Sequence, residues 1–310
     1  MNRRSSLAVL TAALGATPLA ALAADPIGLQ LGTMGADGSA EPFYGVDHNF
    51  FKDAGLDVKI TVMNNTAQLA SAVAGGALEI GYGSVVPVAQ AHLRGLEFRM
   101  IAPALVYTAP ALTNAIMTGK NATFKSGADL NGQVVAVNGL RDISQYEMQA
   151  WLEQTGGDLK TIKLIEIPFP EMGTALESGR VAAAITAEPF TTGALGQAKI
   201  IGNGSAAVGK HYMVTGWFAS TDWLAKNADT ARRVQATMLK IAKWANANHA
   251  DTQQIILKYT KITPDVAAKM LRTTYGESKV DGSIMQPAID VAVKYGGMPY
   301  VAASDLVWQG

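Results

Sequence analysis

The feature that most constrains the fold is an order of elements that occurs twice along the chain. Residues 27–84 read as strand, helix, strand, helix, strand, and residues 132–186 repeat that order. In both copies a glycine ends the helix before the second strand, Gly55 in the first and Gly156-Gly157 in the second. Alternating strands and helices predict βαβαβ units with parallel strands. We therefore expect an α/β protein with two similar lobes.

The remaining segments predict how these lobes are joined. Two strand-like stretches surround Pro110, and two more run through residues 198–220, so each pair would carry the chain across a hinge. We expect lobe 1 to comprise residues 24–110 and 216–310, and lobe 2 residues 111–215. Further helices are expected at about 230–248 with Asp229 as cap, from Pro264 with Thr263 as cap, and at 285–295, all returning to lobe 1.

Residues 1–23 predict a secretory signal peptide. Arg3-Arg4 precede an apolar run, and Ala21-Leu22-Ala23 supplies the small residues of a cleavage site. A membrane anchor is the alternative, but the run is short and is interrupted by Gly15 and Pro18. The twin-arginine and general export routes both stay open. We expect a periplasmic protein that has no lipid anchor, because the chain has no lipidation cysteine.

The composition excludes several functional classes. Lys+Arg and Asp+Glu both total 25, so the chain lacks the basic excess of nucleic-acid-binding proteins. Its zero cysteines exclude disulfides, thiolate nucleophiles and cysteine metal sites. The four histidines are scattered without metal-ligand spacing, and the chain has no Walker, G-x-S-x-G or dinucleotide-binding motif. We therefore predict no enzymatic activity, no metal and no cofactor.

Candidate ligand-binding residues lie where expected strands end and helices begin. Helix N-termini have unpaired N–H groups, and the carboxyl ends of strands in open α/β sheets commonly bind ligands. The stretch VAAAITAEPF, Val181 to Phe190, illustrates this, because a buried strand there ends at a carboxylate followed by proline. The candidate set is Thr33, Met34, Glu41, Phe43, Tyr44, Asn64, Asn65, Thr66, Gly83, Ser84, Asn138, Arg141, Asp142, Ser144, Glu188, Phe190 and Trp217.

Many of these residues also have an ordinary structural interpretation. Helix capping would account for Asn64, Asn65, Ser84 and Ser144. Ser144 also has capping-box spacing to Glu147. Glu188 would either face a ligand or accept hydrogen bonds from backbone N–H groups of its own lobe. Arg141 would be a solvated loop charge, and Trp217 would pack in the hinge.

Charge and aromatic content predict the class of ligand. Arg141 would hold a carboxylate or sulfonate, which makes a small organic acid with an apolar or aromatic part the first expectation. The alternative is an amine-bearing or pyrimidine-like solute held by Glu41 or Glu188, since an anion beside two carboxylates is disfavoured. A bare inorganic ion ranks lower because it would leave the aromatic loop residues unused: Phe43, Tyr44, Tyr82, Phe190 and Trp217.

Five phrases together resemble the nitrate/sulfonate/taurine-type (SsuA/TauA-like) substrate-binding proteins of ABC importers: FFKDAGLDV, LASAVAGGALEIGYGS, DLNGQVVAV, ALESGRVAAAITAEPF and TGWFAS. The resemblance covers about Ile27 to Tyr295. It implies the type II periplasmic-binding-protein fold, with a ligand cleft between two α/β lobes and two hinge crossovers. It also implies delivery of the solute to an inner-membrane permease. Ala182 stands where this family usually has aspartate.

Other activities on the same fold must be weighed against transport. The thiamine-pyrimidine synthase branch carries a cysteine-rich stretch and the desulfinase branch uses a cysteine nucleophile, so the absence of cysteine disfavours both. A solute-sensing module that presents its closed form to a receptor stays open. We expect a monomer whose partners are a small-molecule ligand and an ABC permease, with no nucleic acid.

Overall fold

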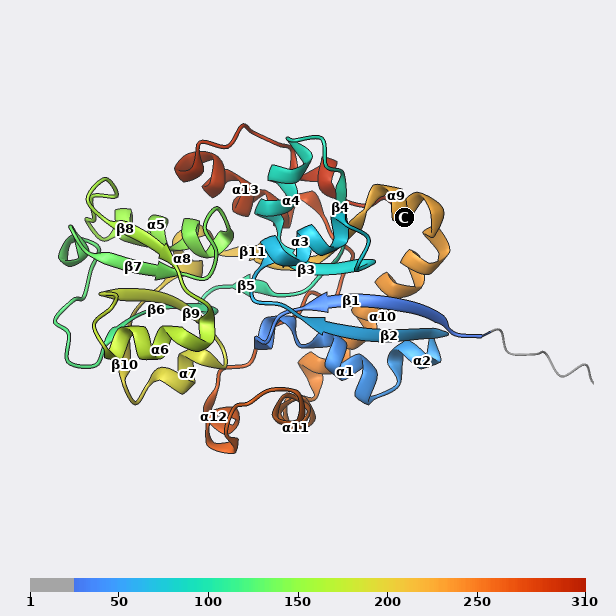
Figure 1. Ribbon diagram of the computed structural model, residues 1–310, viewed down its shortest axis with the longest axis horizontal. Coiled ribbons are helices and arrows are strands. Elements are labelled where there is room, and N and C mark those ends of the chain that lie inside the picture. The colour runs from blue at the N-terminus through green and yellow to red at the C-terminus, as the bar shows by residue number, and fades with distance from the viewer. Residues whose placement is uncertain (1–24) are drawn as a thin grey trace, which may run out of the picture.

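The computed structural model describes residues 25–310, so the predicted signal peptide, residues 1–23, lies outside the described part of the chain. Figure 1 shows an elongated molecule with two α/β lobes side by side, joined near its centre. Within residues 25–310, no helix is long and apolar enough to cross a membrane.

The first lobe is built on a five-stranded sheet in the order β2–β1–β3–β12–β4. Strand β1 pairs in parallel with β2 and β3, whereas β12 runs antiparallel between β3 and β4. The strands are β1 Ile27–Thr33, β2 Leu56–Val62, β3 Ile80–Ser84, β4 Phe98–Pro103 and β12 Thr215–Ser220.

The second lobe has a five-stranded sheet in the order β8–β7–β9–β6–β10. Strand β7 is parallel to β8 and β9, and β6 runs antiparallel between β9 and β10, so each strand has a counterpart in the first sheet. The strands are β6 Asn114–Gly119, β7 Val134–Val137, β8 Lys163–Glu166, β9 Ala183–Ala187 and β10 Ala198–Asn203. The two similar lobes predicted from the sequence repeat are thus confirmed.

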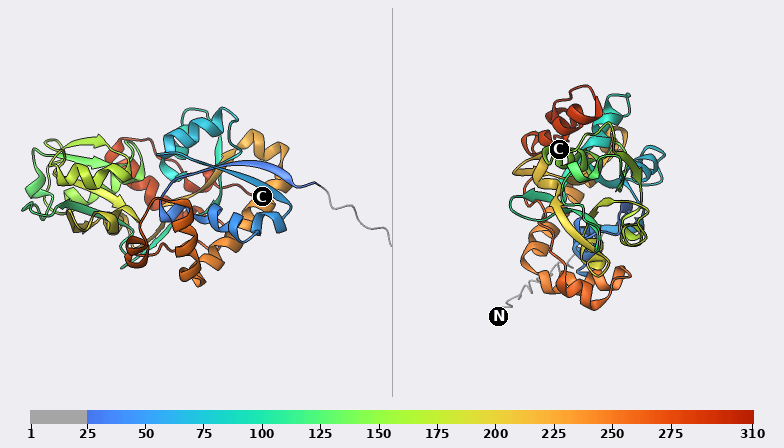
Figure 2. Two further views of the ribbon diagram at one scale, coloured as in Figure 1. Left: turned by 60° about the horizontal axis from the view of Figure 1, so that its bottom comes forward. Right: turned by 90° about the vertical axis from the view of Figure 1, so that its left-hand side faces the viewer.

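Helices lie on both sides of each sheet, with α3 and α4 opposite α1, α2 and α10 in the first lobe (Figures 1 and 2). Those before the hinge in the chain are α1 Glu41–Asp47, α2 Phe50–Asp53, α3 Thr66–Ala74 and α4 Val85–His92. The second lobe has α5 Ile143–Gln154, α6 Phe169–Glu177, α7 Phe190–Ala194 and α8 Gly204–Val208. After β12 come α9 Thr221–Lys226, α10 Ala228–Ala247, α11 His249–Tyr259, α12 Pro264–Lys269 and α13 Gly282–Gly296. Short 3₁₀ turns span Asp37–Ser39, Ala128–Leu130 and Ala303–Leu306.

Helix capping follows the sequence at some ends and departs from it at others. Thr263 caps α12 as predicted, its Oγ1 accepting a hydrogen bond from the N–H of Val266 at 3.3 Å. The cap predicted at Asp229 is wrong, because α10 already begins at Ala228. The capping box predicted for α5 is also wrong. Asp142 caps that helix, and Glu147 is buried among polar side chains instead of reaching back to the helix start.

The second sheet is buried on both faces, which explains its runs of small apolar residues. Along β6, Ala115 and Met117 belong to one apolar cluster, while Ile116 between them belongs to another. Because side chains alternate along a strand, the two clusters lie on opposite faces of the sheet. The stretch around β9 divides in the same way, with Ala184 in the first cluster and Ile185 in the second.

The lobes are joined by two strands that pair with each other. β5, Val106–Thr108, and β11, His211–Met213, form a two-stranded antiparallel sheet at the centre of the molecule (Figure 1). The Tyr107 and Tyr212 rings lie 5.6 Å apart between their centroids. Two crossovers that are hydrogen-bonded to each other form an arrangement about which two lobes can rotate as a hinge.

We predict that the close approach of Gly127 to α5 makes this position intolerant of a side chain. A Cβ there would lie 2.1 Å from the carbonyl oxygen of Leu152. Gly127→Ala should therefore reduce the free energy of unfolding by about 1–3 kcal/mol, measured by urea denaturation. Gly193→Ala is the control, because nothing lies within 4 Å of a Cβ at that position. Equal losses in both variants would contradict the packing argument.

Candidate ligand-binding cleft

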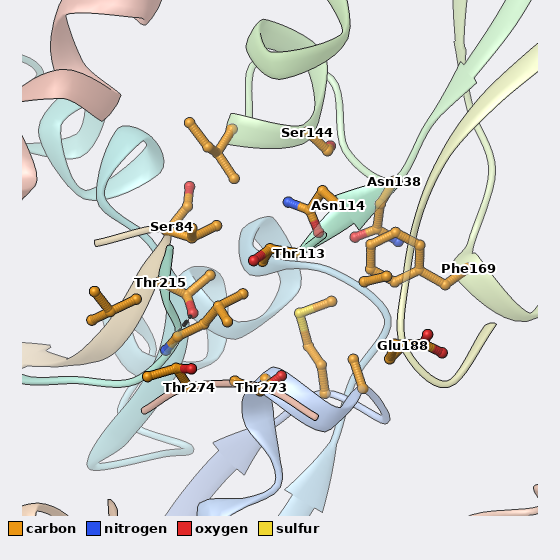
Figure 3. A pocket seen from close by; sticks show the side chains of 18 of the residues that line it. Ser84, Thr113, Asn114, Asn138, Ser144, Phe169, Glu188, Thr215, Thr273 and Thr274 are labelled. Atoms are coloured by element: carbon orange, nitrogen blue, oxygen red, sulfur yellow. Dashed lines mark hydrogen bonds between the residues drawn. The ribbon is translucent and has the colours of Figure 1, made fainter. Parts of the chain in front are cut away.

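A cavity of about 250 Å³ lies between the two lobes, where strand ends of both sheets meet the hinge. Figure 3 shows Ser84, Thr215 and Thr274 on one side of it, and Asn138 and Phe169 on the other. Several candidates predicted from the sequence line this cavity: Met34, Thr66, Ser84, Asn138, Asp142, Ser144 and Glu188. The structure thus brings together residues from both copies of the repeat.

The other candidates do not line this cavity: Thr33, Glu41, Phe43, Tyr44, Asn64, Asn65, Gly83, Arg141, Phe190 and Trp217. Tyr44 and Trp217 are fully buried in the core of the first lobe. Phe43 and Phe190 line a second cavity of about 490 Å³, which shares Phe169 with the first. The hydroxyl of Thr33 donates to the carbonyl of Ser39 at 2.5 Å.

Three of these residues shape the cleft from outside the cavity. Asn65 caps α3 and donates from Nδ2 to Oε1 of Glu166 in the second lobe at 3.1 Å. The carbonyl of Asn64 accepts a hydrogen bond from Nδ2 of Asn138 at 3.4 Å. Gly83 lets α3 approach β3, because a Cβ there would lie 2.2 Å from the side chain of Thr66.

Arg141 does not face the cavity, which removes the predicted grip on an acid. It is exposed, has a φ of 59°, and lines a separate hollow with Leu140 and Glu166. Its N–H donates to Oε1 of Gln145 at 2.8 Å, which fixes the loop in this orientation. The left-handed backbone at Arg141 was not apparent in the sequence, and neither was the place of this residue outside the cavity.

Glu41 lies in the core of the first lobe. It is fully buried, and its Oε2 accepts a hydrogen bond from Nε1 of Trp217 at 2.8 Å. Its Oε1 has no hydrogen-bond partner within the described residues. Burial raises the pKa of Glu41 well above that of an ordinary carboxyl group, against the smaller effect of the Trp217 hydrogen bond.

Asp142 forms the most direct polar contact across the cleft. Its Oδ1 accepts hydrogen bonds from the Ser84 hydroxyl of the first lobe and from the N–H of Ile143 at 2.5 Å. Burial raises the pKa of Asp142, partly offset by the hydrogen bond from Ser84. The carboxylate also occupies the positive end of α5, where a ligand anion would otherwise be stabilised.

Glu188 links the second lobe to the C-terminal segment. Its carboxylate accepts hydrogen bonds from the N–H and hydroxyl of Thr192, at 3.1 and 2.9 Å, and from the N–H of Leu271 at 3.2 Å. Its carbonyl accepts from the N–H of Asp37 at 2.9 Å. Burial raises the pKa of Glu188. Glu188 therefore lines the cavity and also accepts hydrogen bonds from backbone N–H groups of both lobes.

An arginine that the sequence did not single out lies in the wall, but it is already paired. Arg272 donates from Nη2 and Nε to the buried carboxylate of Asp37, at 2.7 and 3.2 Å. Its Nη1 is fully buried and has no partner within the described residues.

Other wall residues were also missed by the sequence interpretation, including Thr113, Asn114, Phe169, Thr215, Thr273 and Thr274. Asn114 and Thr215 are the first residues of β6 and β12, the antiparallel strands that start at this edge of the sheets. A search of the strand starts after each crossover would have found them. No such signal marks Thr273 or Thr274.

Both carboxamides in the wall donate one hydrogen bond to a group that does not line the cavity. Asn114 donates from Nδ2 to Oε2 of Glu147 at 2.6 Å, and Asn138 donates to the carbonyl of Asn64. Neither Oδ1 accepts a hydrogen bond from the described residues or is fully buried, so both are available in the cavity. With Asp142, they place acceptor oxygens in a wall that also contains hydroxyl groups, such as those of Ser144 and Thr274, which can donate or accept.

The profile of the family described as NMT1/THI5 like matches residues 39–251. A curated relative, the formylaminopyrimidine-binding protein of Halalkalibacterium halodurans, is 27% identical over 143 residues, 46% of this chain and 42% of the relative. The match therefore spans less than half of that protein's length.

Solved structures share the whole fold. The ligand-binding component of an ABC-type import system from Staphylococcus aureus has a TM-score of 0.78 at 17% identity, covering 91% of this chain and 96% of the other. The alkanesulfonate-binding protein SsuA from Xanthomonas axonopodis pv. citri has a TM-score of 0.77 at 17% identity, covering 92% and 99%. The nitrate-binding protein NrtA from Synechocystis PCC 6803 has 0.74 at 13%, covering 91% and 84%. The expected periplasmic-binding-protein fold is confirmed.

We predict that Glu41 destabilises the fold as pH rises. Because its pKa is raised in the folded state, the folded protein binds more protons than the unfolded chain above the ordinary carboxyl pKa, so stability falls with increasing pH. Glu41→Gln keeps an acceptor for Trp217 and removes this titration. Relative to wild type, the variant should gain about 1 kcal/mol or more between about pH 5 and pH 8, measured by urea unfolding. A difference independent of pH would contradict the assignment.

Proposed function

The chain belongs to the NMT1/THI5-like family, and from this membership and its fold we propose that it is the substrate-binding component of an ABC importer. The two lobes would close over a small solute and deliver it, chemically unchanged, to a membrane permease. The predicted signal peptide supports a periplasmic location. Three structural relatives are named as ligand-, alkanesulfonate- and nitrate-binding proteins, which supports binding without turnover.

The proposed ligand class rests on the hydrogen-bonding groups that line the cavity. The wall offers the oxygens of Asn114 and Asn138 and the carboxylate of Asp142, while its arginine, Arg272, is paired with Asp37. Such a site favours a solute that donates hydrogen bonds and disfavours an anion. We therefore place an amine-bearing, pyrimidine-like solute first.

Two further observations support this choice. Phe169 and Tyr82 supply aromatic surface in the wall, and a cavity of about 250 Å³ suits a single substituted ring. The curated relative from Halalkalibacterium halodurans is named as a formylaminopyrimidine-binding protein. The organic acid expected from Arg141 becomes the second choice, because that side chain lies outside the cavity.

The ligand class can be tested with two pyrimidines that differ in one group. 4-Amino-2-methylpyrimidine should bind, whereas 2,4-dimethylpyrimidine should bind about 10- to 100-fold more weakly, because the buried acceptors lose their donor. Isothermal titration calorimetry would give both affinities. A binder at about a hundredfold excess over Kd should also stabilise the fold by about 2.7 kcal/mol. Tighter binding of ethanesulfonate or benzoate would overturn the assignment.

Two variants compare Asp142, which lines both the cavity and the neighbouring hollow, with Arg141, which lines the hollow but not the cavity. Asp142→Asn keeps the helix cap and removes the carboxylate, so binding of 4-amino-2-methylpyrimidine should weaken about tenfold or more. Arg141→Ala is the matched control and should bind as wild type, because Arg141 does not line the cavity. A loss confined to Arg141→Ala would place the binding site in the hollow beside Arg141 and contradict the cavity assignment.

Motion of the lobes gives a further prediction. We propose that residues 24–110 with 216–310, and residues 111–215, rotate as two units about β5 and β11. Ligand should favour the closed form, in which Ser84 bonds to Asp142 across the cleft. Solution scattering should show a smaller radius of gyration when 4-amino-2-methylpyrimidine is saturating. An unchanged radius would contradict hinge closure.

A further inference from the structure

A buried carboxylate behind the cavity wall binds the side chain of a residue that lines it. Glu147 on α5 is fully buried, and its Oε2 accepts the hydrogen bond from Nδ2 of Asn114 at 2.6 Å. Its Oε1 accepts hydrogen bonds from the hydroxyls of Ser205 and Tyr212, at 2.9 and 2.5 Å. Glu147 itself does not line the cavity, so its effect on a ligand would pass through Asn114.

The chemistry of the pair decides which way the carboxamide faces. An ionised carboxylate only accepts hydrogen bonds, so Asn114 must turn its N–H₂ group toward Glu147. The opposite end of the carboxamide, Oδ1, has no hydrogen-bond partner among residues 25–310. Since Asn114 lines the cavity, that oxygen is its group available to a ligand. Figure 3 shows the Asn114 side chain in the wall beside Thr113.

The three donors come from segments that only the folded hinge brings together. Asn114 opens β6 just after the first crossover, Tyr212 lies in β11 of the second crossover, and Ser205 lies in α8. With three donors, the carboxylate keeps its ionised form despite complete burial more readily than an unpaired one. Wherever Glu147 is ionised, the orientation of Asn114 is therefore fixed before a ligand arrives.

We propose that Glu147 is a specificity-determining residue, which holds the Asn114 carboxamide with its oxygen toward the ligand and so selects a solute that donates a hydrogen bond there. This inference rests on the proposed function. A solute that presents an acceptor at this position would leave Oδ1 unpaired in a largely buried site, at a cost of about tenfold or more in affinity.

The decisive variant is Glu147→Gln. A glutamine can still accept hydrogen bonds from Ser205 and Tyr212 with its oxygen, but it then offers N–H₂ to Asn114. Asn114 would then accept that hydrogen bond with its Oδ1, and its own N–H₂ group would face the cavity. The ratio of affinities for 4-amino-2-methylpyrimidine, a donor, over 4-methoxy-2-methylpyrimidine, an acceptor, should fall about tenfold or more relative to wild type.

Ser205→Ala is the matched control. It removes one donor to the Glu147 carboxylate but leaves the hydrogen bond to Asn114 in place. It should lower stability without changing the ratio of affinities. A ratio unchanged in folded Glu147→Gln, or changed equally in Ser205→Ala, would overturn the proposal and leave Glu147 a purely structural residue.

A measurement without ligand separates this proposal from the proposed function. Burial raises the pKa of Glu147 to about 7, an effect opposed by Tyr212, Asn114 and Ser205 and reinforced by the charge of Asp142. Tyr107 also lies within electrostatic reach, from β5. The ¹⁵N side-chain resonance of Asn114 should therefore shift with a midpoint near this pKa in the wild type and lose that transition in Glu147→Gln.

Failure of the proposed ligand class and failure of the positioning role of Glu147 can be told apart. If neither pyrimidine binds the wild type, the proposed ligand class is wrong, and the resonance still reports whether Glu147 holds Asn114. Asn114 side-chain amide protons that exchange with water as fast as those of an exposed carboxamide would show that Glu147 does not hold them, which overturns the positioning role. This second result needs no variant, so it stands even if Glu147→Gln does not fold.

Discussion

The cleft depends on the antiparallel pairing of β5 with β11. Because these crossovers bond to each other, the chain re-enters each sheet at the same place, where β6 and β12 begin. The first residues of those strands, Asn114 and Thr215, therefore meet in the cavity with the ends of parallel strands from both lobes. A single short ribbon thus determines which parts of two separate sheets face a ligand.

Local patterns in the sequence were sufficient for the architecture and for part of the cleft. Strand and helix alternation depends on neighbouring residues, so the two lobes could be predicted, and so could strand-end residues such as Ser84 and Asp142. The direction of a side chain could not. Trp217 points into the core because of the register of β12, and Arg141, which has a left-handed backbone, lies outside the cavity. Arg272 meets Asp37 across 235 residues, beyond any local pattern.

The fold and the ligand are set by different features of this protein. Structures with 13–17% identity and similar folds are named for nitrate and alkanesulfonate binding, so the arrangement of lobes does not choose the solute. In our proposal the choice falls to the orientation of a few polar groups, above all the carboxamides of Asn114 and Asn138. Each carboxamide donates a hydrogen bond to a group that does not line the cavity, Oε2 of Glu147 for Asn114 and the carbonyl of Asn64 for Asn138.

The strand order of the two sheets also bears on how the chain is made. All five strands of the second sheet lie within residues 114–203, so that lobe can complete its sheet as soon as this segment has emerged from the ribosome. The first sheet cannot, because β4 joins it only through β12, which begins at Thr215. During synthesis, the lobe that comes first in the sequence must therefore wait with an open sheet edge until the later one has been made.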